Sequence, residues 1–214
     1  MNALRLFALG MLVLGLASCK DNETAEGNKE AVPTTTARQS EDVKPAVHTT
    51  KVEQFADAKQ KVPAGYQYIV KIGDQVPAFT ADIATGGQIT PADLEGKVTM
   101  LQFTASWCGV CRKEMPHIEK DIWQTYKDRK DFVLLGIDID EERDKVVKFG
   151  QDVNVTYPLV LDPGSKIFHL FAEKGAGVTR NVIIDRTGRI VFMTRLFKEE
   201  EFEAMKDVLD GLMK

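Results

Sequence analysis

The chain has 214 residues, and its 28 Lys and Arg against 32 Asp and Glu give a formal net charge of −4 at pH 7. This acidic balance argues against a nucleic-acid-binding protein, which needs a basic surface to displace phosphate counterions. A hydrophobic content of 43% excludes wholesale disorder, and three cysteines with three histidines are too few for a disulfide-stapled scaffold or a rich metal cage.

Residues 1–18 have the composition of an export signal. Arg5 is the only charged side chain, and the almost unbroken apolar run that follows it covers residues 6–17. That run is shorter than the ~20 residues that a membrane-spanning helix needs. The segment ends in Leu16-Ala17-Ser18-Cys19, which resembles the lipobox of bacterial lipoproteins. The resemblance implies that Cys19 becomes the lipidated N-terminus of an exported protein. The alternative is an ordinary signal peptide with an incidental cysteine.

Residues 19–65 are predicted to form a flexible tether. Between residues 20 and 50 the apolar residues are seven Ala or Val, too few and too small to offset the entropy of ordering the chain. Within the tether, Val52, Phe55 and Ala56 recur at helical spacing and predict a short helix over residues 51–62. Such a tether would let an anchored domain reach large partners.

Residues 66–214 are predicted to form one α/β domain with a mixed sheet, because strand and helix patterns alternate along it. Ser165 is expected to cap the third of its helices. Apolar runs bounded by turn residues predict strands over 98–103, 132–137, 157–161, 181–185 and 189–193, the last two joined as a hairpin. Apolar residues at helical spacing predict helices over 108–129, 141–151, 166–173 and 198–214.

Two of the three cysteines lie in Trp107-Cys108-Gly109-Val110-Cys111, where the first of these strands meets the first helix. Cysteines at i and i+3 share a helix face, with ~5–6 Å between Cβ atoms, and a slightly unwound first turn brings them within disulfide distance. Free N–H groups and the helix dipole favour a thiolate at Cys108. In such motifs the pKa of the leading thiol falls from ~8.5 to about 7 or lower. Cys108 is therefore predicted to be both the better nucleophile and the better leaving group.

Other functions of this cysteine pair have less support. A zinc site needs about four ligands, and His117 and His169 are isolated in the sequence. A static disulfide that closes so short a loop would restrict the unfolded chain little. The Pro-x-x-x-Thr/Ser-x-x-Cys pattern of peroxiredoxins is missing, because Leu101 and Ala105 occupy the matching positions. A Cu(I)-binding module that uses both cysteines and one histidine, or an adaptor with incidental cysteines, is the alternative that stays open.

The segment from Thr104 to Pro116 resembles the active-site segment of the TlpA/ResA-type thiol–disulfide oxidoreductases, which are bacterial members of the thioredoxin-like family. The similarity extends to residues 73–79 and 178–185, so it covers essentially all of residues 70–214. It implies a thioredoxin-like fold, in which helices flank a central mixed β-sheet, with the extra β/α insertion of this type. It also implies an enzyme that reduces or exchanges disulfides in exported proteins and needs no cofactor beyond its redox-active dithiol.

The resemblance assigns roles to individual residues. Cys108 would attack the partner and form a mixed disulfide, and Cys111 would resolve it. Glu114, one turn after Cys111, would accept the proton of the Cys111 thiol; the alternative is a solvated helix carboxylate. Trp107 would shape the surface on which the substrate docks. Pro116 would kink the helix, because proline removes a backbone hydrogen bond.

Two positions depart from the family's pattern. Thr179 stands where the family places a cis-proline opposite the cysteines, so it would add a hydroxyl near the sulfurs. The backbone of Val178 would pair with an extended substrate segment. Gln102 stands where thioredoxins keep a buried acid, and a neutral amide cannot take a proton from Cys111. This substitution increases the weight placed on Glu114.

The partners and location expected from these features form a consistent set. The protein would act on protein thiols and disulfides as a monomer, and a redox partner would recycle its dithiol. Lipid on Cys19 would hold it in the cell envelope, facing the periplasm or on the outer membrane or cell surface. No nucleic-acid partner is expected.

Overall fold

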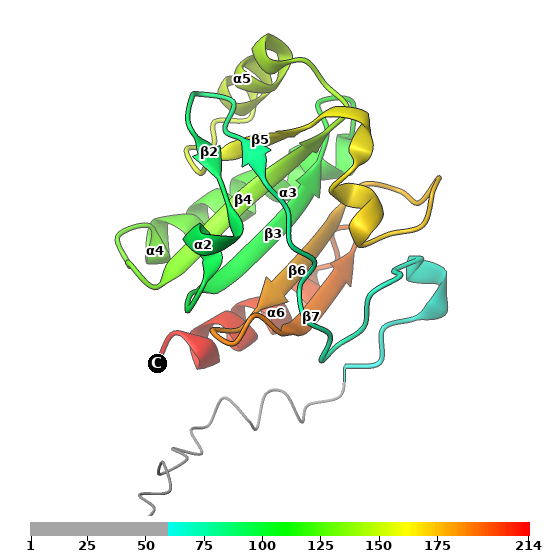
Figure 1. Ribbon diagram of the computed structural model, residues 1–214, viewed down its shortest axis with the longest axis vertical. Coiled ribbons are helices and arrows are strands. Elements are labelled where there is room, and N and C mark those ends of the chain that lie inside the picture. The colour runs from blue at the N-terminus through cyan, green and yellow to red at the C-terminus, as the bar shows by residue number, and fades with distance from the viewer. Residues whose placement is uncertain (1–59) are drawn as a thin grey trace, which may run out of the picture. The chain divides into compact units, whose positions relative to one another are not determined.

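The structure, a computed structural model, describes residues 60–214, so the predicted export signal, Cys19 and nearly all of the predicted tether lie outside the described residues. Of the predicted 51–62 helix only residues 60–62 are described, and they are not helical. In the described part, five strands form one sheet (Figure 1). In spatial order they are β5 (Leu159–Asp162), β4 (Phe132–Ile139), β3 (Val98–Thr104), β6 (Arg180–Ile184) and β7 (Ile190–Arg195).

The sheet is mixed, as the sequence predicted. Strands β3, β4 and β5 are parallel, whereas β6 is antiparallel to both β3 and β7. The helix α5 (Arg143–Asp152) connects β4 to β5, and α5 and β5 together correspond to the predicted β/α insertion. The two sides of β3 differ, because successive side chains point to opposite faces of a sheet. Phe103 packs on the rings of Phe168 and Phe171, while Gln102 and Thr104 bond to the helix that follows β3.

The single helix predicted over residues 108–129 consists of three consecutive helical segments. These are α3 (Gly109–His117), a π-helical stretch (Ile118–Trp123) and α4 (Gln124–Tyr126). Pro116 was predicted to kink this helix. Its ring nitrogen has no hydrogen to donate, and the wider π-helical stretch begins two residues after it, so the departure from regular α-helix occurs where the proline removes a hydrogen bond. The C-terminal helix α6 (Glu199–Leu212) packs beside this run, where the hydroxyl of Tyr126 bonds to Asp210.

The helix predicted over residues 166–173 is wrong. Two short 3-10 turns occupy this region, Pro163–Ser165 and Phe168–Leu170. Ser165 has a left-handed φ of 55°, which is unlike the extended backbone of a helix cap. The carboxylate of Asp162 instead accepts the backbone N–H groups of Ile167 and Phe168 at 2.8 and 2.9 Å. Because these bonds hold a tight turn at the end of β5, the helical spacing of the sequence is not realised here.

Several short elements precede β3 and were not predicted from the sequence. They are a 3-10 turn (Ala64–Tyr66), the strands β1 (Ala81–Asp82) and β2 (Gln88–Ile89), and the helix α2 (Pro91–Leu94). Each spans two to four residues, so none is long enough to show a periodic pattern. None of the helices of residues 60–214 combines the length and apolar character needed to span a membrane.

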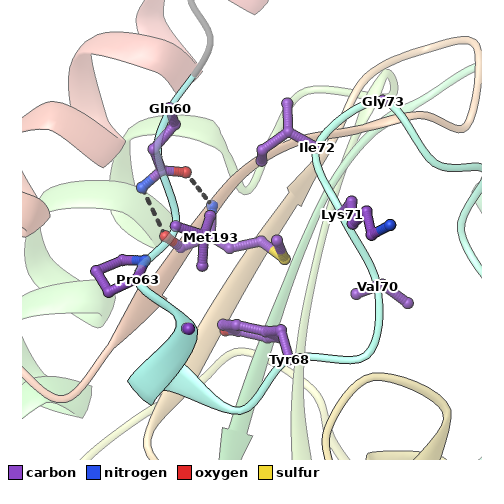
Figure 2. Close-up of a pocket in the computed structure, with 10 residues that line it drawn as sticks. Gln60, Pro63, Tyr68, Val70, Lys71, Ile72, Gly73 and Met193 are labelled. Atoms are coloured by element: carbon purple, nitrogen blue, oxygen red, sulfur yellow. Dashed lines mark hydrogen bonds between the residues drawn. The ribbon is translucent and has the colours of Figure 1, made fainter.

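The N-terminal part of the domain closes the edge of the sheet at β7. The side-chain amide of Gln60 donates to the carbonyl of Met193 at 2.7 Å and accepts its N–H at 2.9 Å, as a neighbouring strand would (Figure 2). A cavity of about 510 Å³ opens beside this contact, between residues 60–73 and β7. Neither cysteine lines it. The Gln60 amide therefore occupies backbone groups of β7 that would otherwise be free to pair with a strand of another chain.

Candidate active site

The end of β3 and the start of α3 bring the two cysteines together. Cys108 has an extended backbone and caps α3, and the N–H of Cys111 donates to Cys108 Sγ at 3.1 Å. The two residues form a disulfide, with 5.3 Å between their Cα atoms. The sulfur predicted to be the nucleophile thus lies at the positive end of a helix and receives a backbone hydrogen bond, an arrangement that favours a thiolate.

The two sulfurs differ in their access to solvent. Cys111 is fully buried, whereas Cys108 is 8% exposed, and the neighbouring Trp107 is 65% exposed. A partner can therefore reach Cys108 more easily than Cys111. This asymmetry matches the attacking and resolving roles expected from the sequence.

Thr179 lies directly opposite the disulfide, in the segment that leads into β6. Its Oγ1 is 3.1 Å from Cys108 Sγ and 3.3 Å from Cys111 Sγ, and the residue is 2% exposed. The preceding Val178 is also buried. The sequence analysis placed both residues beside the cysteines, and the structure puts the Thr179 hydroxyl in contact with both sulfurs.

Glu114 lies on α3 one turn after Cys111 and is buried, with 1% of its surface exposed. Gln102 Nε2 donates to one of its carboxylate oxygens at 3.1 Å, and Asn181 Nδ2 donates to the other at 2.7 Å. Burial raises the pKa of Glu114 from 4.5 to about 7, although the two amide donors act in the opposite direction. Glu114 is therefore not the solvated carboxylate considered above, but a buried acid that titrates near neutrality.

Two residues that help to hold this carboxylate, Asn181 and Tyr157, were not predicted from the sequence. Asn181 pairs with Gln102 across β3 and β6, and it also donates to Thr194 Oγ1 at 2.9 Å. The Tyr157 hydroxyl donates to Gln102 Oε1 at 2.7 Å, which turns the NH₂ group of Gln102 toward Glu114. The only local signal was a polar Asn at the start of the apolar strand run 181–185. Its partner depends on the pairing of β3 with β6, which the sequence does not specify.

Two further acidic residues, Glu141 and Asp138, lie near the turn before Cys108, and Glu141 bonds to it. Glu141 accepts the N–H of Ser106 at 2.6 Å and its hydroxyl at 2.7 Å, and it also pairs with Lys145. Asp138 is fully buried nearby, and neither of its carboxylate oxygens has a hydrogen-bond partner among the described residues. Burial and the negative charge of Glu141 raise the pKa of Asp138 to about 8. The sequence analysis singled out neither acid.

The described residues give little support to a copper site. The ring of His117 stacks on Phe197 at 4.9 Å and lies edge-on to Phe202 at 6.1 Å. Within residues 60–214, no three His, Cys, Asp or Glu side chains gather in a way that could hold a metal ion. The arrangement that the site does provide is a disulfide-forming cysteine pair with a buried carboxyl, Glu114, on the same helix.

Comparison with known proteins agrees with this geometry. Residues 72–193 match the AhpC/TSA family. The chain is 30% identical over 167 residues to a thiol-disulfide oxidoreductase ResA of Bacillus cereus, covering 78% of this chain and 88% of ResA.

Two solved structures are similar to this one. A candidate protein disulfide isomerase from Bacteroides thetaiotaomicron has 56% identity and a TM-score of 0.67, covering 69% of this chain and 92% of that protein. A candidate thiol:disulfide interchange protein DsbE from Chlorobium tepidum has 28% identity and a TM-score of 0.58, covering 67% and 99% of the two chains. The predicted thioredoxin-like fold is confirmed by these similarities.

Proposed function

Because this chain belongs to the AhpC/TSA family and is a thiol–disulfide oxidoreductase of the ResA type, we propose that it reduces or exchanges disulfides in exported proteins. The observation that carries the proposal is the disulfide between a reachable Cys108 and a buried Cys111 at the start of α3. A disulfide there can open and close without unfolding the domain, because its two residues lie within one turn of the same helix start.

In the first step of the proposed reaction, the Cys108 thiolate attacks a disulfide of the client protein. A bond forms between Cys108 Sγ and one client sulfur, and the other client sulfur leaves as a thiolate. The helix N-terminus and the Cys111 N–H support the negative charge on Cys108 before the attack. The limited exposure of Cys108 restricts the reaction to disulfides that can approach the rim beside Trp107.

In the second step, Cys111 Sγ attacks Cys108 Sγ, which closes the disulfide seen in the structure, breaks the bond between Cys108 and the client sulfur, and releases that sulfur as a thiolate. The Cys111 thiol must lose its proton first, and the proposed acceptor is the carboxylate of Glu114, one helical turn away. With a pKa of about 7, Glu114 is about half ionised at neutral pH and can both accept and release this proton. The client leaves as a dithiol, and a separate redox partner returns two electrons to the Cys108–Cys111 pair.

The proposed docking surface for the client surrounds Cys108. Trp107 is the most exposed aromatic side chain there and offers a flat apolar contact. Val178 and Thr179 line the opposite side, where the backbone of an extended client segment would pair with Val178.

The proposed location rests on the sequence of the N-terminus. A lipid on Cys19 would anchor the enzyme in the cell envelope, and residues 19–65 would tether the catalytic domain. Membrane-fraction protein should carry the lipid on its N-terminal peptide by mass spectrometry, and Cys19→Ala should move the protein to the soluble fraction. A Cys19→Ala protein that stays with the membrane would contradict the anchor.

The decisive test of the activity is insulin reduction with dithiothreitol as the electron source. Cys108→Ala should abolish the activity. Reduced Cys111→Ala, freed of dithiothreitol and then mixed with insulin, should accumulate a mixed disulfide that appears as a larger band on a gel run without reducing agent. Cys19→Ala is the matched control, since it removes a thiol that has no part in the exchange, and it should retain full activity. Unchanged insulin reduction by the Cys108→Ala protein would refute the proposed function.

A further inference from the structure

The hydroxyl of Thr179 occupies an unusual position for a side chain that takes no part in a reaction. It lies within 3.3 Å of both active-site sulfurs and is shielded from water. Sulfurs in a disulfide carry no hydrogen, so in these contacts the Thr179 hydroxyl is the donor. The two sulfurs are its only side-chain partners among the described residues.

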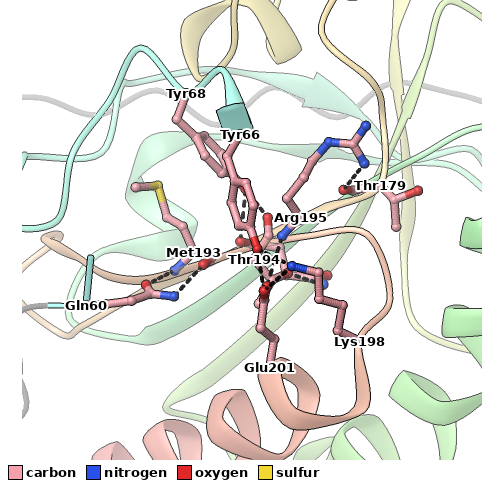
Figure 3. Close-up of polar contacts among 10 residues, drawn as sticks. Gln60, Tyr66, Tyr68, Thr179, Met193, Thr194, Arg195, Lys198 and Glu201 are labelled. Carbon is pink, nitrogen blue, oxygen red and sulfur yellow. Dashed lines mark hydrogen bonds and ion pairs between the residues drawn. The ribbon is translucent and has the colours of Figure 1, made fainter. Parts of the chain in front are cut away.

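The backbone around Thr179 fixes the hydroxyl in this place. The Thr179 carbonyl accepts the N–H of Leu196 at 3.0 Å. It also accepts Nη1 of Arg195 at 3.4 Å (Figure 3). On the other side, Nε of the fully buried Arg180 donates to the carbonyl of Gly177 at 2.9 Å. The donor is therefore held toward the sulfurs before any charge develops on them, which is the condition for effective electrostatic stabilisation.

We propose that Thr179 is a catalytic residue whose hydroxyl donates a hydrogen bond to whichever of the two cysteine sulfurs is ionised. In the reduced enzyme it stabilises the Cys108 thiolate that attacks the client. During resolution it stabilises the Cys111 thiolate, because a small rotation of the hydroxyl turns its hydrogen from one sulfur to the other. The proton stays on the Thr179 oxygen throughout, so the electron and proton balance of the exchange is unchanged.

This inference rests on the proposed exchange reaction and adds a consequence for its direction. A neutral disulfide sulfur is a weak acceptor, whereas a thiolate is a strong one, and bonds to charged acceptors are roughly twice as strong as neutral ones. The Thr179 hydroxyl therefore stabilises the reduced form more than the oxidised form. It should make Cys108 ionise at a lower pH and make the enzyme a stronger oxidant.

The test compares Thr179→Val, which keeps the shape, with Thr179→Ser, which keeps the hydroxyl. In the full-length protein, iodoacetamide labelling of Cys108 is followed against pH by mass spectrometry of its peptide, which separates it from the other two cysteines. Thr179→Val should move the midpoint of this profile up by about one pH unit, a tenfold change in the ionisation constant. The equilibrium with glutathione should shift about tenfold toward the disulfide, which corresponds to about 30 mV. Thr179→Ser should retain most of the wild-type behaviour.

Thr99→Val is the matched control. Thr99 is also a buried threonine, but its hydroxyl has no partner among the described residues, and it lies at the end of β3 far from the cysteines. Its substitution should leave both measurements unchanged, and near-UV circular dichroism checks that each variant is folded. If folded Thr179→Val titrates and equilibrates as wild type does, Thr179 is not catalytic. Insulin reduction by the wild type, lost in Cys108→Ala, would then still support the exchange reaction.

Discussion

Glu114 should reduce the stability of the folded protein as the pH rises toward neutrality. The unfolded chain releases this proton near pH 4.5, whereas the buried carboxyl releases it near pH 7. Between these values the folded state binds one more proton than the unfolded state, so the stability that Glu114 contributes is complete below pH 4.5 and lost as the pH passes 7. At about 1.4 kcal/mol per pH unit over about 2.5 units, the loss is about 3 kcal/mol.

Glu114→Gln removes this titration and nearly preserves the shape of the side chain. The assay is urea unfolding of the oxidised protein at pH 5, 6, 7 and 8, for the wild type and the variant. Other buried acids titrate in both proteins, so the difference between the two curves isolates Glu114. The variant should gain stability relative to the wild type as the pH rises, until the difference levels off above pH 7. Two parallel curves would mean that Glu114 has an ordinary pKa, and its assignment as a proton acceptor near neutrality would fail.

Three further predictions concern the same site. Glu114→Gln should slow the resolution step about 100-fold at pH 7, since a general base contributes about 10²–10⁴ in rate. The rate of the first attack should stay within about threefold of the wild type. Stopped-flow fluorescence separates the two phases, and a variant in which only the first phase is slower would contradict the role of Glu114. Asp138→Asn should raise the thermal midpoint at pH 9 more than at pH 5, because the wild-type carboxyl, with its pKa of about 8, must ionise in a buried site without a hydrogen-bond partner among the described residues. Tyr157→Phe should shift the pH profile of the resolution step to higher pH. Without the Tyr157 hydroxyl, Gln102 could turn its oxygen toward Glu114, which would disfavour the ionised carboxylate and raise its pKa. An unchanged profile would show that Tyr157 does not orient the amide.

The sheet could be predicted from the sequence because its signals are local. The apolar runs at residues 98–103 and 132–137 are bounded by turn residues, and the structure extends each by only one or two residues, to Thr104 and Ile139. The helix over 166–173 was wrong because the chain forms short 3-10 turns there, with a left-handed Ser165 and with the Asp162 carboxylate holding the N–H groups of Ile167 and Phe168. Propensity and spacing do not reveal such a local side-chain contact with the backbone.

The residues of the active site also fall into those that the sequence predicts and those that it does not. Cys108 and Cys111 were found from their spacing at a helix start, and Glu114 was found from the family resemblance together with its place one turn after Cys111. Asn181 bonds to Glu114, and Tyr157 bonds to Gln102, only because segments far apart in the sequence come together in the fold. Strand order and register are set by the packing of the whole domain, so a single sequence does not identify these partners.

The polar groups beneath the disulfide oppose folding rather than promote it. A carboxyl at the position of Glu114 costs stability once it ionises, and its amide donors, Gln102 and Asn181, occupy core positions that apolar side chains could fill. Buried polar groups of this kind occur where chemistry needs them. Here each of them lies within one or two hydrogen bonds of the acid proposed to take the Cys111 proton, while Thr179 contacts the sulfurs themselves. Replacing Gln102 and Asn181 together with apolar residues would therefore leave Glu114 without donors, raise its pKa further and shift the resolution step to higher pH, whereas a purely structural network would change only the unfolding free energy.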